Sequence, residues 1–212
     1  METPEISLFE AIHTQRAIRR FTDEPVSDEA IQRILGAAVR APSGRNTQPW
    51  RFIVIRDTAT KQKIGDYYRL ACEEAGIGQE PIPGLSKKVN DSVTHLAFHM
   101  GEAPVLVLAC YEYLNEEAVG TSTILTGSSI YPAVQNLLLA ARALGLGTSL
   151  TTVHSMFEDE IKDLLGIPAN VQTAALIPLG YPSPEERFGG SRRRPVAEVT
   201  HFDRWSDEAG AT

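Results

Sequence analysis

Residues 41–55, APSGRNTQPWRFIVI, combine a polar turn with an apolar strand. Ordinary turns use Gly, Pro, Asn or Ser because these residues supply special φ/ψ angles or local hydrogen bonds. Pro42 and Gly44 meet that need, whereas Ser43, Asn46 and Gln48 add hydrogen-bonding groups that a turn does not require. A polar ring or the edge of a carbonyl would need such groups, so the surplus indicates a ligand contact at this turn.

Two clusters of arginine stand out in a chain with a formal net charge of -7 at pH 7. The first contains Arg16, Arg19 and Arg20, and the second is residues 192–194. The planar fork of arginine matches phosphate and carboxylate groups, so the clusters favour a small phosphorylated or carboxylated ligand. The alternative is that both are solvated charge runs. The acidic balance argues against nucleic acid or an anionic membrane as a partner, because these select broad basic patches.

Other catalytic signatures are weaker. His95 and His99 share one face of a predicted helix, but no third ligand is evident from spacing, so no metal site is expected. Ser43 lies in neither a G-x-S-x-G nor an S-x-x-K motif, which leaves acyl transfer as a weak alternative. Residues 145–150, GLGTSL, hold two glycines between a helix and a strand, an order that excludes a Rossmann dinucleotide fingerprint.

The composition is that of a globular protein, with 42% hydrophobic and 22% charged residues. Its 212 residues are enough to bury one core, so we expect a single domain over residues 1–212 with loose ends at 1–5 and 206–212.

Cysteine usage and apolar runs indicate the compartment. Cys72 and Cys110 fit neither a C-x-x-C motif nor a zinc site, which favours a reducing environment without a structural disulfide. The first residues lack the pattern of a secretory signal, and the longest apolar run, residues 103–111, is too short to span a bilayer. The expected location is the cytoplasm, with no membrane partner.

These groups must be positioned by an α+β arrangement. Ser27 and the acidic residues after it predict a helix that ends near Pro42, and a strand follows at 51–55. Residues 76–85 are rich in Gly and Pro and predict a loop. Further helices are expected at 57–75, 86–100, 128–144 (with Pro132 in its first turn) and 156–168, and further strands at 104–111, 148–152, 171–182 and 196–202. The fold class is α+β, with helices packed around a small central mixed β-sheet.

Four stretches carry a resemblance to a known family: TQRAIRRF, APSGRNTQPWRFIVI, PAVQNLLLAARALGLGTSLTT and RRRPVAEVTHFDRW. In order and separation they resemble the FMN-dependent nitroreductase family, from about residue 7 to residue 205, and the second stretch is the most specific. The resemblance implies a nitroreductase-like fold and a homodimer with two FMN molecules at its interface, each touched by both chains.

The resemblance also implies roles for the polar turn and the first arginine cluster. Pro42, Ser43, Gly44 and Asn46 would contact the isoalloxazine ring. Arg16 would bind the FMN phosphate, and Arg19 would place a cation beside the N1/O2 edge, where it favours the reduced flavin.

Later segments complete the implied site. Leu150, Thr151 and Thr152 are the candidates to give a backbone N–H to flavin N5. Arg193 matches the C-terminal phosphate position, with Arg192 or Arg194 in support.

Two residues depart from the family string, which is close to R-R-S-I-R-R-F. Gln15 replaces the first arginine and Ala17 replaces the serine, so phosphate or ribityl contacts are weakened near Ala17. We therefore expect FMN to be held less tightly than in typical members.

The implied activity is a ping-pong transfer of hydride from NAD(P)H through flavin N5 to a small nitroaromatic, quinone or similar acceptor. No side chain needs to act as acid or base. One alternative is another flavin chemistry on the same scaffold, either dehalogenation or fragmentation of the flavin. The other is a flavin-binding storage or sensor protein without turnover.

Overall fold

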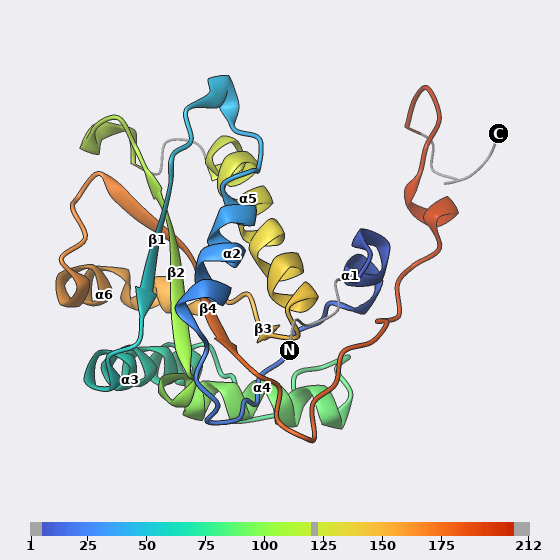
Figure 1. Ribbon diagram of the computed structural model, residues 1–212, viewed down its shortest axis with the longest axis horizontal. Helices are drawn as coiled ribbons and strands as arrows, with labels where there is room; N and C mark the ends of the chain where they lie inside the picture. The colour runs from blue at the N-terminus through green and yellow to red at the C-terminus, as the bar shows by residue number, and fades with distance from the viewer. Residues whose placement is uncertain (1–5, 120–122, 206–212) are drawn as a thin grey trace.

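The protein is represented by a computed structural model that describes residues 6–119 and 123–205. The ends predicted to be loose, residues 1–5 and 206–212, lie outside the described part. The helices are α1 (Leu8–Thr14), α2 (Asp28–Ala38), α3 (Thr58–Glu74), α4 (Lys87–His99), α5 (Thr123–Ala143) and α6 (Glu158–Leu165), and the strands are β1 (Trp50–Ile55), β2 (Val105–Glu112), β3 (Gly147–Thr148) and β4 (Val171–Gly180) (Figure 1).

The four strands form one sheet in the order β1-β2-β4-β3. The α+β class is confirmed, but every pairing between these strands is antiparallel, whereas a mixed sheet was expected. The reason is visible between β1 and β2, where α3 and α4 fold back on each other and return the chain to the end of the sheet that it left (Figure 1). Beside β3, parallel pairing is reduced to an isolated bridge between Ala17 and Thr148.

Side chains of β2 alternate between two cores, one on each face of the sheet. Val105 and Val107 pack with α2 and α5, whereas Leu106 and Leu108 pack with α3, α4 and α6. This alternation follows from the two-residue period of a strand, and all four side chains are buried because helices cover both faces.

Predicted helix starts agree with the observed caps. The Ser27 hydroxyl accepts a hydrogen bond from the Ala30 N–H at 3.1 Å, and the Asp57 carboxylate accepts one from Thr60 N–H at 2.8 Å. These bonds satisfy amide groups that a helix leaves unpaired in its first turn.

Two expected boundaries were wrong. Helix α5 begins at Thr123, so Pro132 lies well inside it and not in its first turn. Ile124 and Leu125 in its first turn are exposed. The first turns of α5 therefore lack the buried apolar face from which a helix is predicted. The strand expected at 148–152 is limited to β3 and a bridge between Thr151 and Leu176.

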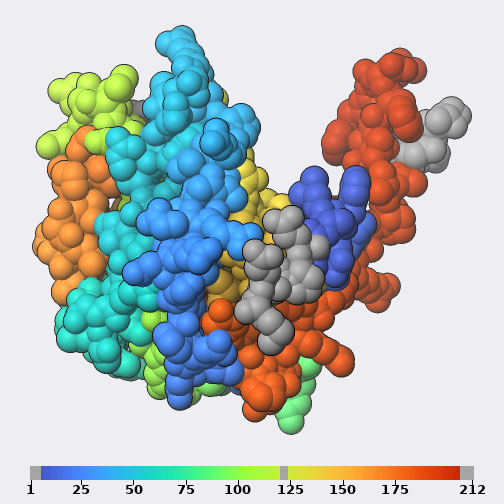
Figure 2. All heavy atoms as spheres, viewed as in Figure 1, coloured from blue at the N-terminus to red at the C-terminus, as the bar shows by residue number. Residues whose placement is uncertain are grey.

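The segment after β4 forms an arm that leaves the body of the subunit. The strand expected at 196–202 was wrong: Val196–Val199 form a 3-10 turn. Its alternating pattern is that of a strand, but a strand needs a neighbour to pair with, and residues 190–199 are all exposed. Figure 2 shows this arm, in red, projecting from the body with an open notch beside it.

Candidate functional site

The first arginine cluster lies along β3. Ala17 bridges to Thr148, and the Ile18 N–H donates to the Thr148 carbonyl oxygen at 2.9 Å. This close approach requires glycine at position 147, where a Cβ atom would lie 2.6 Å from Ile18 Cγ2. The backbone of residues 16–19 is therefore fixed against the strand that leads into residues 150–152.

Arg16 and Arg19 give this edge of the sheet a local positive charge. Burial lowers the pKa of Arg19, and Arg16 acts in the same direction, while Tyr68 and Glu186 oppose the shift. Within residues 6–119 and 123–205, no hydrogen bond or ion pair is made by Arg16. Two neighbouring cations, one of them without a counter-ion in the described chain, suit a doubly charged anion such as a phosphate ester.

Arg20 has a different role from its two neighbours. Its guanidinium donates to the Asp91 carbonyl oxygen at 3.4 Å and lies 3.9 Å from the Glu186 carboxylate. These contacts connect it to α4 and the start of the arm.

The segment 150–152 lies at the same edge, and its hydrogen bonds narrow the choice of donor. The Thr151 N–H donates to the Leu176 carbonyl oxygen at 3.1 Å, and the Thr151 hydroxyl donates to the same oxygen at 2.8 Å. The Thr151 N–H is thus already used. In the described part of the chain the N–H groups of Leu150 and Thr152 donate to no protein acceptor, so these two remain the candidates for a ligand.

The polar turn is shaped by its own side chains. Arg45, Asn46 and Gln48 all have positive φ angles (52°, 57° and 48°), which are uncommon for residues other than glycine. The Ser43 hydroxyl accepts from the Gln48 N–H at 3.0 Å, and the Gly44 N–H donates to the Ser129 hydroxyl at 3.4 Å. Part of the polar surplus therefore fixes the turn, while the side chain of Asn46 is exposed.

The turn and the arginine cluster lie at opposite ends of the subunit. Ser129, which contacts the turn, is near the start of α5, whereas Arg142 near its end donates to the Thr14 hydroxyl at 2.8 Å. Ser129 and Arg142 are thirteen residues apart, or about 20 Å along a helix. Figure 1 shows the same separation, with the turn at the top and residues 15–20 at the lower end of α5. One chain does not bring the two halves of the predicted site together.

The base of the arm returns to the arginine cluster. The Gly189 N–H donates to the Thr14 carbonyl oxygen at 2.9 Å, and the Arg142 guanidinium lies 4.2 Å from the centre of the Phe188 ring. Thr14 is two positions before Arg16 in the sequence. The base of the arm therefore lies next to the start of the first arginine cluster. Arg193 follows four residues later with an exposed side chain, whose guanidinium donates to the Arg192 carbonyl oxygen at 3.2 Å.

The histidine pair and the cysteines are also located. The rings of His95 and His99 stack with centroids 4.2 Å apart, and His99 Nδ1 lies 2.9 Å from Glu102. In the described ranges no three His, Cys, Asp or Glu residues are placed to hold a metal ion. Cys72 and Cys110 are free thiols, and both are buried. None of the described helices is long and apolar enough to cross a membrane.

Two residues near the site were missed by sequence reasoning. Tyr68 of α3 is buried, and its hydroxyl lies near the side chains of Thr151 and Cys72, which places it behind the segment 150–152. Ser129 supports the polar turn. Neither has a sequence signal, because a tyrosine or serine within a helix is ordinary in type and spacing.

Comparison with known proteins identifies the family. The family model "Nitroreductase family" matches residues 12–181, which is most of the chain. The chain belongs to the nitroreductase family. It is 32% identical over 200 residues to the NADH dehydrogenase of Thermus thermophilus (87% of this chain, 90% of the relative) and 31% identical over 192 residues to the 5,6-dimethylbenzimidazole synthase of Rhodospirillum rubrum (85% and 87%).

A solved structure of the nitroreductase fold is similar over most of the chain. It is an oxidised iodotyrosine deiodinase bound to FMN and 3-iodo-L-tyrosine, with 25% identity, a TM-score of 0.74, and coverage of 94% of this chain and 100% of that one. The chain is therefore a homologue of oxidoreductases and belongs to a flavin-binding family. Its own residues fit such a group, since Arg16 and Arg19 supply cations and Leu150 and Thr152 supply free N–H donors at one edge of the sheet.

Proposed function

We propose that this protein is an FMN-dependent oxidoreductase that takes electrons from NAD(P)H and passes them to a nitroaromatic, a quinone or a similar small acceptor in a ping-pong cycle. The observation that carries the proposal is the convergence of Arg16 and Arg19 with the N–H groups of Leu150 and Thr152 beside β3. Cations for a phosphate and donors for a ring nitrogen occur together there, as the two ends of one flavin nucleotide require.

Each group has a role in this proposal. Arg16 and Arg193 hold the phosphate, Arg19 stands beside the N1/O2 edge, and the Leu150 or Thr152 N–H faces N5. FMN, when bound, supplies the hydride acceptor and donor. The protein contributes position, electrostatics and exclusion of water, and no side chain is required as acid or base.

The same proposal includes a homodimer with two shared sites. The polar turn at Pro42–Asn46 lies about 20 Å along α5 from the arginine cluster of its own chain, so it reaches a ring only in a partner's site. The exposed arm offers apolar side chains for the partner to cover, since Val196, Phe202 and Trp205 are 76%, 62% and 80% exposed. A two-fold axis then produces two equivalent sites.

Two relatives favour a second candidate. One is named for deiodination and the other for synthesis of 5,6-dimethylbenzimidazole, so reductive dehalogenation or flavin fragmentation is the alternative chemistry on this scaffold. A flavin-binding storage or sensor protein is the alternative without turnover.

The test begins with the purified protein, which should be yellow and release FMN on denaturation. Steady oxidation of NADH or NADPH with a nitroaromatic or quinone, at a rate that far exceeds its rate without acceptor, would support the proposal. Halide release from an iodinated phenol with no turnover of nitroaromatics would favour dehalogenation. Flavin binding without oxidation of either nicotinamide would favour storage or sensing.

A further inference from the structure

A cavity separate from the arginine cluster opens at the end of the sheet where β1 begins and β2 ends. Its volume is about 550 Å³, which lies within the range of small-molecule sites in proteins. Its walls come from residues 47–51, residues 111–114, the first turns of α5, and Asn170 before β4. It lies directly after the polar turn in sequence.

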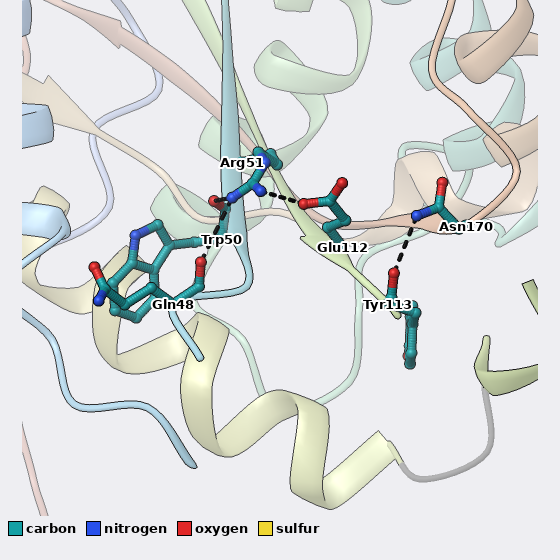
Figure 3. A network of polar contacts seen from close by, with 6 residues as sticks. All are labelled: Gln48, Trp50, Arg51, Glu112, Tyr113 and Asn170. Carbon is teal, nitrogen blue, oxygen red and sulfur yellow. Dashed lines mark hydrogen bonds and ion pairs between the residues drawn. The ribbon is translucent and has the colours of Figure 1, made fainter. Parts of the chain in front are cut away.

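An ion pair forms one wall of this cavity (Figure 3). Arg51 pairs with Glu112, and its guanidinium also donates to the Trp50 carbonyl oxygen at 2.9 Å. The side chains remain 55% and 36% exposed, so both charges are held in place and still accessible from the cavity. The backbone beneath them is fixed, because the Glu112 N–H donates to the Pro49 carbonyl oxygen at 2.8 Å.

Two tyrosine rings form an aromatic corner in the same cavity. The ring centroids of Tyr111 and Tyr113 are 4.7 Å apart, and the angle between the two ring planes is 56°. Two hydrogen bonds fix Tyr113. Its hydroxyl donates to the Gln172 side chain at 2.8 Å, and its carbonyl oxygen accepts from the Asn170 side chain at 3.0 Å. The corner can take another flat ring in an edge-to-face or offset arrangement.

The charges of the lining residues decide the class of ligand. Arg51 and Glu112 carry the formal charges among the residues that line the cavity, one of each sign, so their sum is zero. A phosphate ester bound at Arg51 would meet the Glu112 carboxylate beside it. A molecule with both a carboxylate and an ammonium group can satisfy both side chains, and an attached ring can reach the tyrosine corner.

From this combination we propose that the cavity binds a small zwitterionic molecule with an aromatic ring, of the type of an aromatic α-amino acid. The carboxylate lies at Arg51, the ammonium group at Glu112, and the ring at Tyr111 and Tyr113. Within one chain this site is separate from the edge of β3 that we propose for flavin, although in the proposed dimer it lies next to the turn that reaches the partner's flavin. Its recognition of a zwitterion does not depend on the redox function.

The test measures binding of L-phenylalanine to the flavin-loaded protein by calorimetry or saturation-transfer NMR. L-Phenylalanine should bind at least about tenfold more tightly than 3-phenylpropionate, phenethylamine or L-alanine, which lack the ammonium group, the carboxylate and the ring, respectively. Equal binding of 3-phenylpropionate and L-phenylalanine, or no binding of either, would overturn the proposal without any variant.

Variants locate the binding. Arg51→Met and Glu112→Gln should each weaken L-phenylalanine binding about tenfold or more. The matched controls are Arg69→Met and Glu73→Gln, which alter an exposed ion pair of 2.8 Å on α3 and should leave binding unchanged. If all four variants bind L-phenylalanine as the wild type does, the amino acid binds elsewhere, for example against the flavin, and the assignment to this cavity is wrong.

Discussion

At the scale of single residues, Arg16 and Arg19 differ in their surroundings although both contribute to one positive edge. Arg19 is partly buried with Tyr68 and Glu186 nearby, and burial lowers its pKa. Arg16 makes no hydrogen bond or ion pair in the described chain. A cation that no carboxylate neutralises is available to a ligand, and its removal disturbs few protein contacts.

Arg16→Ala and Arg193→Ala should therefore weaken FMN binding more than folding. Each change removes charge-assisted hydrogen bonds, with an expected cost of roughly 2 kcal/mol, or about thirtyfold in Kd. Flavin fluorescence titration measures the affinity, and urea unfolding of the apoprotein measures the stability. Unchanged FMN affinity in both variants would show that the phosphate is bound elsewhere.

His154 lies two residues after the proposed flavin segment and is fully buried, and neither ring nitrogen has a hydrogen-bond partner. Burial lowers its pKa to about 4, whereas a histidine in an unfolded chain has a pKa of about 6.5. Between these values the unfolded state binds the proton and the folded state does not. The free energy of unfolding should thus decrease as the pH is lowered from about 6.5 to 4, by at most roughly 3 kcal/mol.

His154→Leu tests this because it removes both the titration and the two unpaired nitrogens. The variant should lose much of the decrease in unfolding free energy across this pH window and be no less stable than the wild type at pH 7. His13→Leu, at an exposed position of α1, is the control. A wild-type pH dependence in His154→Leu would contradict the assignment.

At the scale of elements, β3 is only two residues long, and its contact with residues 16–18 depends on Gly147. Gly147→Ala would place a Cβ atom 2.6 Å from Ile18 Cγ2, and such overpacking costs about 1–3 kcal/mol. Stability in urea should fall, and FMN affinity should fall with it, since Arg16 and Arg19 flank Ile18.

The matched control for that variant is Gly36→Ala in α2, where a Cβ atom meets nothing within 4 Å. Alanine is a better helix former than glycine by about 1 kcal/mol, so this change should stabilise the protein. Equal effects of the two substitutions would show that the contact with Ile18 does not limit position 147.

Elements with local signals could be predicted from the sequence, and those defined by distant contacts could not. Ser27 and Asp57 are caps that act within one turn, so the starts of α2 and α3 were predicted nearly to the residue, whereas α2 ends at Ala38, before the expected end near Pro42. The start of α5 has exposed apolar residues and no such signal. The pattern at 196–202 indicated a strand, but no local rule states whether a pairing partner is present.

The features of the candidate site fall into the same two groups, those with a local sequence signal and those defined by distant contacts. Residue types and order indicated Arg16, Arg19 and the turn at Ser43–Asn46, because each is a local motif. That the Thr151 N–H is taken by Leu176, or that Tyr68 lies behind this segment, depends on packing between elements far apart in sequence.

At the scale of the whole molecule, the turn and the arginine cluster of one chain are separated by about 20 Å along α5, and this predicts the outcome of mixing two variants. An Arg16→Ala chain and an Asn46→Ala chain should each have low activity as homodimers when FMN is limiting. Their heterodimer should have one doubly altered site and one intact site if, as proposed, the two residues of each site come from different chains. Activity should therefore reappear on mixing and subunit exchange.

The control is an Arg16→Ala chain mixed with a double-variant chain that carries both Arg16→Ala and Asn46→Ala. No site in this pair is intact, so no activity should return. Light scattering establishes the oligomeric state, and FMN should promote association if it binds only the dimer. A fully active monomer, or no recovery in the first mixture, would refute the shared site.

The strand order also has a consequence for the growing chain on the ribosome. β4 lies between β2 and β3, yet 58 residues separate the end of β2 at Glu112 from the start of β4 at Val171. Until those residues are synthesised, the apolar β2 can pair with β1 on one side only, and its other edge stays open to neighbouring nascent chains. Translation speed through α5 and α6 thus sets how long that edge is exposed.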